Sequence, residues 1–439
     1  MSGADTAGMP SSSRAGIAAS PEVAQRFGAV RSRTLALARP LSEEDCCAQS
    51  MPDASPVKWH LAHTTWFFET FILEQHEPGF RPFDPAFRVL FNSYYNGVGD
   101  KHPRAQRGML TRPALSTVIA YRRNVDERMQ VLLHHPGEAA AVQELVELGL
   151  QHEHQHQELI LTDVKHLLSL NPLKPAYVER SEGTMPRRVG NASPAEAALE
   201  PAWIAFEGGV VSIGSADGFC FDNELPRHEI LLRPYLLGSR LVTNQEFLAF
   251  IDSGAYAEPS LWLSEGWDWI RANGIVHPAY WMERDGVRGE FSLSGMRGLN
   301  PTEPVSHVSY FEADAFARWS GARLPTEAEW EHAAAGCAIQ GHFAEARDFH
   351  PRPSSQAGLD QMYGDVWEWT ASSYAPYPGY RPAAGTIGEY NGKFMVNQYV
   401  LRGGSCATPQ DHIRASYRNF FPANARWQFS GIRLARDPM

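Results

Sequence analysis

The stretch "GLQHEHQHQELIL", residues 149–161, places three histidines within five positions of a segment that otherwise has the pattern of an apolar helix. Each helical residue advances by about 100°, so side chains four positions apart lie on one face, one turn along. His152 and His156 therefore share a face with Leu159, and His154 points away from it. Two imidazoles at this spacing on an apolar face predict a metal site with nitrogen ligands.

A third ligand must come from another helix, and "WHLAHTTWFFE", residues 59–69, supplies one. His63 lies on the apolar stripe of this helix, whereas His60 lies at its border. Asp163 shares the face of the histidine pair but lies two turns beyond His156, about 10 Å along the axis, which is too far to bind the same ion. The alternative is that these histidines are core residues that only hydrogen-bond their neighbours.

Helical periodicity dominates the chain up to about residue 170 and then gives way to short β-like pieces. Four long helices predict a four-helix bundle. The segment between the second and third helices, residues 77–110, is rich in Gly, Pro and Asn, and loops of that length are usually functional. The predicted organisation is a disordered tail over residues 1–20, the bundle over 21–175, a linker over 176–200 and a mixed α+β domain over 201–439.

The second half contains local signals for a few helices and turns. Thr243 and Thr326 are expected helix N-caps, and Glu329, three residues after Thr326, predicts a capping box. The segment "GDVWEWT", residues 364–370, is expected to be a structural turn rather than a catalytic centre. These signals, between short β-like pieces, are typical of an α+β domain.

Composition excludes several classes of function. The chain has 439 residues, 43% of them hydrophobic, and a net charge of −11, which argues against nucleic acid or an anionic membrane as a partner. The N-terminal residues lack the basic and apolar regions of a secretory signal, and no apolar run reaches the length of a membrane span. Five scattered cysteines suit a reducing cytoplasm, which is the expected location.

At these motifs the chain resembles a known family. "WHLAH" and the HxxxHxE pattern resemble the DinB-like iron domain of the ergothioneine-biosynthesis sulfoxide synthases. In the second half, "PVSHVSYFEADAFARWSGARLPTEAEWE", "LRGGSCAT" and "GIRLARD" resemble the formylglycine-generating-enzyme (sulfatase-modifying factor) fold, which is C-type-lectin-like. Leu434 stands where formylglycine-generating enzymes carry a terminal active-site cysteine, so that activity is not expected. The resemblance covers roughly residues 20–437.

The resemblance implies a reaction in which ferrous iron, Fe(2+), and dioxygen join a thiol to Nα-trimethylhistidine (hercynine). The sulfur attaches to the imidazole carbon between the two nitrogens and is oxidised to the sulfoxide. The family's iron ligands correspond to His63, His152 and His156. Its substrate-binding residues correspond to Gln155 for the imidazole of hercynine, Arg104 and Arg107 for the carboxylate of the thiol, and Asn419 close to hercynine. Aromatic faces hold trimethylammonium groups, and Phe420, Phe421 and Trp427 are the candidates.

"FNSYYNGVG" and "HPRAQRG" resemble the branch of this family with a tyrosine pair in the first domain. A thiolate beside ferrous iron invites a competing oxidation to sulfinic acid. A phenol that donates a proton at the reacting oxygen would favour carbon–sulfur coupling, and Tyr94, Tyr95 or both are predicted to do this. The alternative is that the two tyrosines only pack in a turn.

The thiol donor is predicted from a departure from part of the family. The branch that uses γ-glutamylcysteine has an Asn-Trp-Asp run in the C-terminal motif, whose carboxylate helps to bind the larger donor. This chain reads "RNFFPANARWQF", with Phe421 in the place of that Asp. A phenyl ring accepts no hydrogen bond from the ammonium group of the glutamyl arm, and burying that group unpaired costs several kcal/mol. Free L-cysteine is therefore the expected donor.

Three other interpretations stay open at this point. Relatives that make ovothiol or selenoneine differ only in the acceptor or in the chalcogen donor. A DinB-like thiol transferase would use three histidines to bind zinc or another divalent ion and activate a thiolate, without a second domain or a tyrosine pair. A non-catalytic ligand-binding scaffold would use the histidines structurally.

Overall fold

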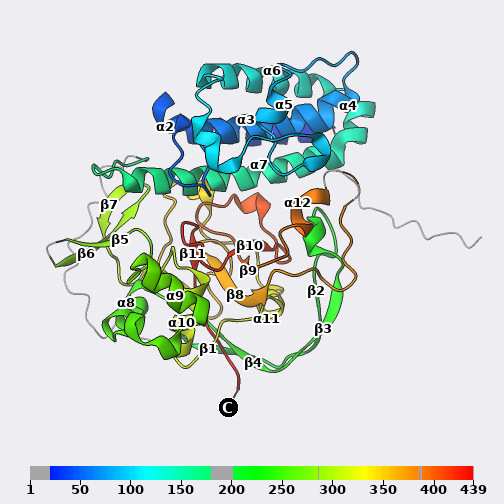
Figure 1. The fold of residues 1–439 in the computed structure, drawn as a ribbon. Helices are drawn as coiled ribbons and strands as arrows, with labels where there is room; N and C mark the ends of the chain where they lie inside the picture. The colour runs from blue at the N-terminus through cyan, green and yellow to red at the C-terminus, as the bar shows by residue number, and fades with distance from the viewer. Residues whose placement is uncertain (1–19, 179–200, 285, 384, 386–387, 439) are drawn as a thin grey trace, which may run out of the picture.

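The computed structural model describes residues 20–438, apart from residues 179–200, 285, 384 and 386–387. Figure 1 shows a layer of helices stacked on a mixed α+β domain. The predicted fold class, a helical bundle followed by an α+β domain, is confirmed. Nearly all of the predicted disordered tail, and the predicted linker after Val178, lie outside the described residues.

The four long helices in the described part of the first domain are α1 (Ser20–Ala38), α3 (Val57–Phe68), α6 (Leu115–Leu133) and α7 (Pro136–Leu170). The chain continues from α3 through a π-helical turn, η1 (Glu69–Leu73), into α4 (Glu74–His76). Aromatic side chains such as Trp66, Phe67 and Tyr121 fill the space between the helices. A short helix, α2 (Glu43–Cys47), lies between α1 and α3.

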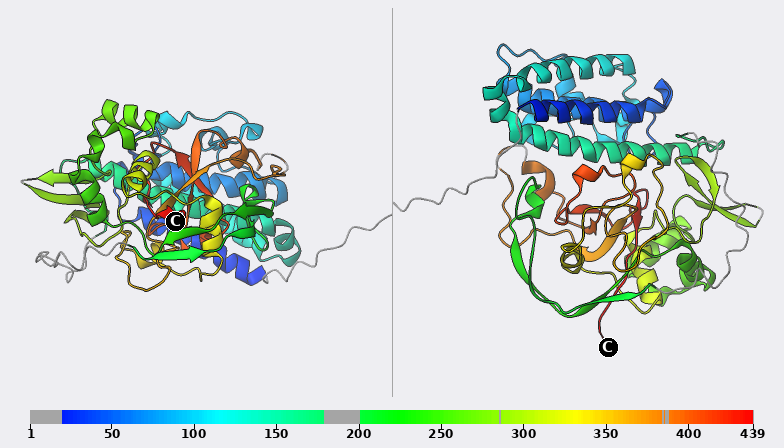
Figure 2. Two further views of the ribbon diagram at one scale, coloured as in Figure 1. Left: turned by 90° about the horizontal axis from the view of Figure 1, so that it is seen from below. Right: turned by 180° about the vertical axis from the view of Figure 1, so that it is seen from behind.

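Helix α7 is shared by the two domains. It is the layer of the bundle nearest to the α+β domain in the views from the front and from behind (Figures 1 and 2). On one side, Glu153 accepts hydrogen bonds from Arg31 and Arg122 inside the bundle. On the other side, Glu158 accepts one from the indole of Trp367 in the second domain, at 2.8 Å. The helix is therefore buried on opposite faces.

The long segment between α4 and α6 is a loop with three short helical turns, as its composition predicts. These turns are α5 (Phe87–Leu90), η2 (Asn96–Val98) and η3 (Arg104–Met109). Asn92 holds the loop together, because its side-chain amide donates to the carbonyls of Tyr95 and Gly99 at 3.0 and 3.1 Å.

The described part of the second domain contains four small sheets. The central one orders its strands β10 (Asn419–Pro422), β9 (Gln398–Arg402), β8 (Trp367–Ser373) and β11 (Ser430–Gly431), with β11 parallel to β8. A second contains β1 (Trp203–Phe206), β4 (Tyr235–Gly238) and β12 (Ala435–Arg436). The others are β2 (Gly209–Ile213) with β3 (His228–Leu232), and the meander β5 (Trp281–Arg284), β6 (Val287–Ser292) and β7 (Gly295–Gly298).

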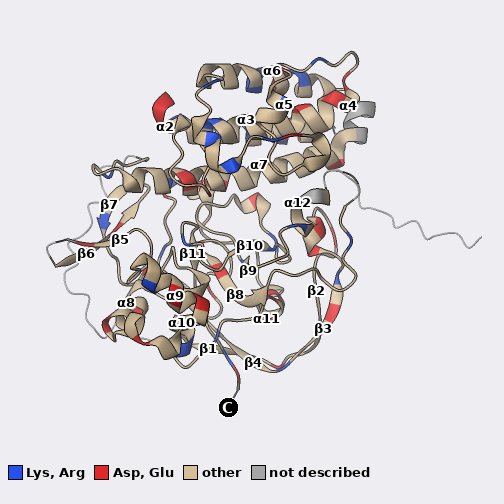
Figure 3. Ribbon diagram, viewed as in Figure 1, with Lys and Arg blue, Asp and Glu red and all other residues tan. Residues whose placement is uncertain are grey.

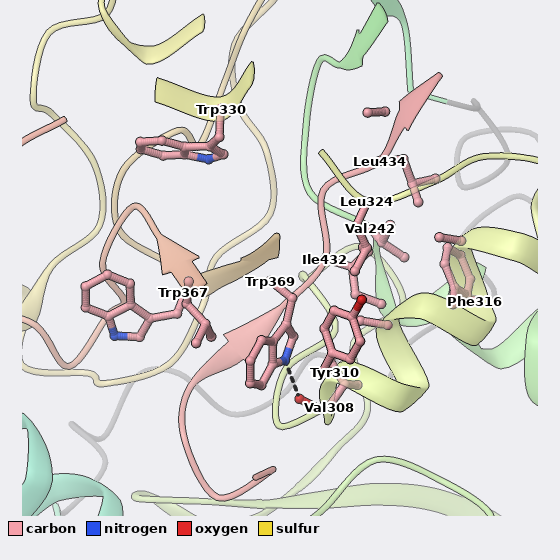
Figure 4. Close-up of a cluster of buried hydrophobic side chains, with 14 of the residues drawn as sticks. Val242, Val308, Tyr310, Phe316, Leu324, Trp330, Trp367, Trp369, Ile432 and Leu434 are labelled. Carbon is pink, nitrogen blue, oxygen red and sulfur yellow. Dashed lines mark hydrogen bonds between the residues drawn. The ribbon is translucent and has the colours of Figure 1, made fainter. Parts of the chain in front are cut away.

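The helices of this domain are α8 (Asn244–Asp252), α9 (Ser264–Asn273), α10 (Tyr310–Trp319), α11 (Glu327–Ala334) and α12 (Glu389–Gly392). Both N-caps predicted from the sequence, Thr243 and Thr326, are confirmed, and Glu329 completes the capping box of α11. Figure 4 shows part of the core, where the Trp369 indole donates to the carbonyl of Val308 at 2.9 Å. Side chains from several short elements pack together in this core and hold β8 against its neighbours.

Two surface properties bear on possible partners. Basic and acidic positions are interspersed over both domains (Figure 3). Within the part of the chain that the structure describes, none of the helices has the length and hydropathy that a bilayer span requires.

Candidate functional site

The three histidines selected by helical geometry lie together. His63 from α3 and His152 and His156 from α7 each offer a nitrogen, and the three nitrogens lie within 4.8 Å of one another. All three side chains are buried. Their ring centroids are 4.6 to 5.0 Å apart. A set of three imidazoles from two helices fits a divalent metal and leaves other coordination positions open.

The hydrogen bonds of these rings leave nitrogens available for a metal. The Nδ1 of His63 donates to the carbonyl of Phe91 at 2.6 Å, which leaves its Nε2 free. The Nδ1 of His152 is buried and has no hydrogen-bond partner among the described residues. Burial lowers the pKa of His152 to about 4, and it lowers the pKa of His63 and of His156 well below the usual value. Neutral imidazoles are the form that binds a metal.

His60 supports the cluster in a way that the sequence analysis missed. Its Nε2 lies 3.0 Å from Asp163 Oδ2, and its Nδ1 lies 2.8 Å from the Nδ1 of His156. Because an ionised carboxylate only accepts, His60 donates from Nε2 and accepts at Nδ1. His156 must then donate from Nδ1, which leaves its Nε2 without a proton for a metal. Asp163, judged too far away to be a ligand, acts on the cluster through His60.

The histidine cluster opens into a cavity of about 230 Å³ between the two domains. Both the bundle and the second domain contribute to its wall. It is bordered by every residue to which the sequence analysis gave a site role: Tyr94, Tyr95, Arg104, Arg107, Gln155, Asn419, Phe420, Phe421 and Trp427, together with the three histidines. The roles themselves remain predictions.

Arg107 is a buried cation without an acidic partner among the described residues. It donates to the hydroxyls of Ser55 and Ser93 at 2.9 and 3.2 Å, and its guanidinium carbon lies 3.3 Å from the ring centroid of Trp59. Burial lowers its pKa to about 9. A buried guanidinium that meets only hydroxyls and an aromatic face is suited to receive a carboxylate.

The two tyrosines occupy different environments. Tyr95 is buried against Trp66 and Phe71, with ring centroids 5.7 and 5.1 Å away. Tyr94 is half-buried, and its hydroxyl accepts a hydrogen bond from Arg104 at 2.7 Å. The sequence left both open as proton donors, and both border the cavity.

Strand β10 supplies the aromatic wall on the other side. Phe420 stacks on Tyr374 with centroids 4.0 Å apart, and Phe421 meets Trp427 edge to face at 6.3 Å. Asn419 uses its Oδ1 to accept from the backbone N–H of Phe420 at 2.9 Å. None of the four residues of β10 is acidic. This wall suits an apolar cation better than a group that needs a carboxylate.

Comparisons with known proteins agree with this two-domain site. The DinB superfamily model matches residues 26–160, and the sulfatase-modifying factor enzyme 1-like domain matches residues 189–358 and 346–438. A protein of Mycolicibacterium thermoresistibile named hercynine oxygenase is 33% identical over 455 residues, covering 95% of each chain. Its namesake from Mycobacterium tuberculosis is 33% identical over 451 residues, covering 95% of this chain and 99% of that one. The chain belongs to the hercynine oxygenase family.

Membership of this family is distinct from the likeness of the second domain alone. A formylglycine-generating enzyme of Streptomyces coelicolor is 32% identical over 259 residues, but it covers only 46% of this chain. In this family member, Leu434 is a buried core residue with 5% of its surface exposed, where those enzymes are expected to carry a cysteine. What the second domain contributes to the site is part of the cavity wall, including Trp367, Asn419 and Phe420.

Contacts across the domain boundary involve the remaining positions of the histidine motif. Gln155 donates to the hydroxyl of Tyr417 at 2.9 Å. His154 points away from the cluster of three histidines, and its fully buried ring lies 5.7 Å from that of His412. The segment "GDVWEWT" bends at Gly364 and Asp365, which have positive φ, and then continues as strand β8, so the expected turn covers only its first residues. It also places Trp367 in the cavity wall, which that expectation did not include.

A second cluster of possible ligands has its own cations. Oxygens of Glu290 and Glu303 lie within 4.8 Å of a nitrogen of His350. Arg297 contacts Glu303 at 2.8 Å, and His350 contacts it at 3.0 Å. Burial alone would lower the pKa of His350, but pairing with Glu290 and Glu303 raises it. Two carboxylates facing two cations form an ion-pair network that needs no metal for charge balance.

Proposed function

We propose that this protein is an iron(II)- and dioxygen-dependent sulfoxide synthase that joins a thiol to hercynine in ergothioneine biosynthesis. One observation carries the proposal: the cluster of His63, His152 and His156 opens into a cavity with walls from both domains. Relatives named hercynine oxygenase match 95% of the chain and so include both walls. A volume of about 230 Å³ suits small molecules and not a polymer. The five free cysteines suit a cytoplasmic location.

The residues of the cluster fit ferrous iron. The proposed ligands are His63, His152 and His156, of which His152 keeps a buried nitrogen without a partner among the described residues. When bound, ferrous iron would supply the dioxygen chemistry that the protein side chains lack. Asp163 and His60 would hold the tautomer of His156.

Arg107 and Arg104 are proposed to bind the carboxylate of the thiol substrate. Arg107 offers a buried guanidinium with no acidic partner among the described residues, and its buried Nε has no hydrogen-bond partner among them. Arg104 is the more exposed of the two and also holds the hydroxyl of Tyr94. A substrate carboxylate at these groups would bring its thiol towards the histidine cluster, because both line the same cavity.

Tyr94, Tyr95 or both are proposed to donate a proton at the reacting oxygen, which would favour carbon–sulfur coupling over oxidation to sulfinic acid. The hydroxyl oxygen of Tyr94 accepts a hydrogen bond from Arg104 at 2.7 Å, and the residue borders the cavity. Tyr95 is more rigidly packed. Both roles need product analysis to be separated.

Hercynine is proposed to bind with its imidazole at Gln155 and its trimethylammonium group against the aromatic wall of Phe420, Phe421 and Trp427, near Asn419. These side chains line one cavity with the histidines. Cysteine is proposed as the preferred donor over γ-glutamylcysteine, because Phe421 offers no acceptor to the ammonium group of a glutamyl arm. A higher kcat/KM for γ-glutamylcysteine at saturating hercynine would contradict that preference.

Two of the three alternative functions make different demands on the site. A metal-dependent thiol transferase would not use dioxygen, and a binding scaffold would keep its affinity for hercynine after losing its metal. An ovothiol- or selenoneine-type enzyme would use the same histidine cluster and would differ only in the acceptor or in the chalcogen donor. The match over both domains favours the sulfoxide synthase over the transferase, which needs no second domain.

The deciding experiment is anaerobic reconstitution with ferrous iron, followed by dioxygen, hercynine and cysteine, with products identified by mass spectrometry. We expect the cysteinyl sulfoxide of hercynine and dioxygen consumption that requires both substrates. His152→Ala should lose most bound iron and activity, as should His63→Ala and His156→Ala. His154→Ala is the matched control from the same helix and should retain iron. Loss of iron in His154→Ala with retention in His152→Ala would refute the ligand assignment.

A further inference from the structure

Four side chains form a hydrogen-bonded chain that crosses the domain boundary beside the cavity. Gln151 and Gln155 lie one turn apart on α7. The Oε1 of Gln151 lies 2.6 Å from Nδ1 of His412, and the Nε2 of His412 lies 3.0 Å from the hydroxyl of Tyr417. The same hydroxyl is 2.9 Å from Nε2 of Gln155. The two hydrogen bonds made by Gln151 and Gln155 join the bundle to the second domain, and the one between His412 and Tyr417 lies within the second domain.

A carboxylate fixes the direction of this chain. The Nε2 of Gln151 donates to Glu147 at 2.8 Å, and an ionised carboxylate only accepts, so the Oε1 of Gln151 must face His412. Burial, together with the neighbouring His154, lowers the pKa of His412 well below its usual value, so the ring is neutral with one donor and one acceptor.

The remaining links follow from those two assignments. Because Oε1 of Gln151 only accepts, Nδ1 of His412 donates and Nε2 accepts. The Tyr417 hydroxyl must then donate to His412, so its oxygen accepts from the Nε2 of Gln155. The amide nitrogen of Gln155 is committed to Tyr417. Its Oε1 has no hydrogen bond to the described residues, and Gln155 borders the cavity.

We propose that Tyr417, held by His412 and Gln151, is a positioning residue that fixes the Gln155 amide so that Oε1 accepts the N–H of the substrate imidazole. The inference rests on the proposed function for the identity of that imidazole. A neutral imidazole carries a single N–H, so an acceptor at this position selects the tautomer whose N–H faces Gln155. Without the Tyr417 hydroxyl, the amide can turn about its terminal bond and present N–H₂ to the same nitrogen. Binding then loses a hydrogen bond for a fraction of the molecules.

The test compares the steady-state constants of the iron-loaded wild type and Tyr417→Phe. The variant keeps the ring, which packs against Trp367 and His412 at 5.5 and 4.7 Å. The KM for hercynine should rise about twofold if the two amide orientations become equally populated, and up to about tenfold if the wrong one dominates, with little change in kcat. Tyr256→Phe is the matched control, because it also removes a buried hydroxyl donor, to Glu312 at 2.7 Å, but does not border the cavity. Its KM should stay at the wild-type value.

A double-mutant cycle separates positioning from a structural role. In the Gln155→Ala background, Tyr417→Phe should not raise the KM further, because there is no amide left to orient. If Tyr417→Phe fails to fold, Gln151→Met provides the same test. It removes the side chain that holds His412 without changing Tyr417, and it should also raise the KM for hercynine. An unchanged KM in Tyr417→Phe, or a full additional loss in the Gln155→Ala background, would overturn the inference. No turnover of hercynine by the wild type would instead refute the proposed function.

Discussion

Replacement of Glu153 by glutamine should destabilise the protein by about 3 kcal/mol at neutral pH, because this carboxylate is the shared acceptor of two buried arginines. Glu153 is fully buried between His152 and His154 on α7. It accepts hydrogen bonds from Arg31 at 2.9 Å and from Arg122. The neutral amide would carry no negative charge and would have one acceptor oxygen in place of two. Two buried guanidiniums would then lose their counter-charge and a hydrogen-bond acceptor.

The pKa of Glu153 gives an independent size and sign for this effect. Burial alone would raise this pKa, but Arg122 and Arg31 outweigh burial and lower it from 4.5 to about 2. A lowering of that size corresponds to about 3 kcal/mol of stability at neutral pH. The contribution is fully present above pH 4.5, the unfolded value, and is lost as the pH falls towards 2. The gap between wild type and Glu153→Gln should therefore narrow on acidification.

Urea unfolding of metal-free protein, followed by far-UV circular dichroism, measures the gap at a series of pH values. Glu74→Gln is the matched control, because Glu74 pairs with Arg88 on the surface and such pairs contribute less than about 1 kcal/mol. A cost for Glu153→Gln no larger than that of Glu74→Gln would refute the argument from buried charge. A gap that widens as the pH falls would refute its sign.

Three further predictions concern the site and its surroundings. His60→Ala should lower the affinity for ferrous iron about 10- to 100-fold through loss of the bond to His156, and titration of metal-free protein with iron would show no change if that bond were incidental. Phenylalanine at Tyr94 or Tyr95 should shift the product towards cysteine sulfinate, whereas unchanged product ratios in both single variants and the double variant would contradict the proton-donor role. His350→Gln should lower the melting temperature most near pH 6 and less as the pH rises. The raised pKa of His350 gives stability that is present below pH 6.5 and is lost as the pH rises above it. A loss of melting temperature that grows with pH would contradict this.

The sequence predicted those parts of the site that depend on local geometry. Helical periodicity brought His152 and His156 to one face, and the apolar stripe of the preceding helix selected His63. The two N-caps, Thr243 and Thr326, were predicted for the same reason, since a cap depends on residues three positions away.

Features that depend on packing between distant segments escaped prediction. The bond between Gln155 and Tyr417 joins residues 262 positions apart, and no local pattern encodes that approach. His60 was placed at the border of its helix because periodicity gives a direction but not a partner, and its partner Asp163 lies on another helix. The meander β5–β6–β7 and helix α9 were also missed, because short elements in a loop-rich domain carry weak periodic signals.

The position of α7 between two domains limits how members of this family can be recombined. A single residue inserted between Gln151 and Glu158 would rotate the part of α7 beyond it by about 100°. The face that carries the histidine cluster and the face that contacts the second domain would both be misaligned. The residues on one face of α7 cannot shift in register without those on the other, since compensating substitutions would be needed in both domains. A chimera of two relatives should therefore be joined beyond Leu170, and its second domain should tolerate exchange only when Tyr417, His412 and Trp367 come with a matching α7.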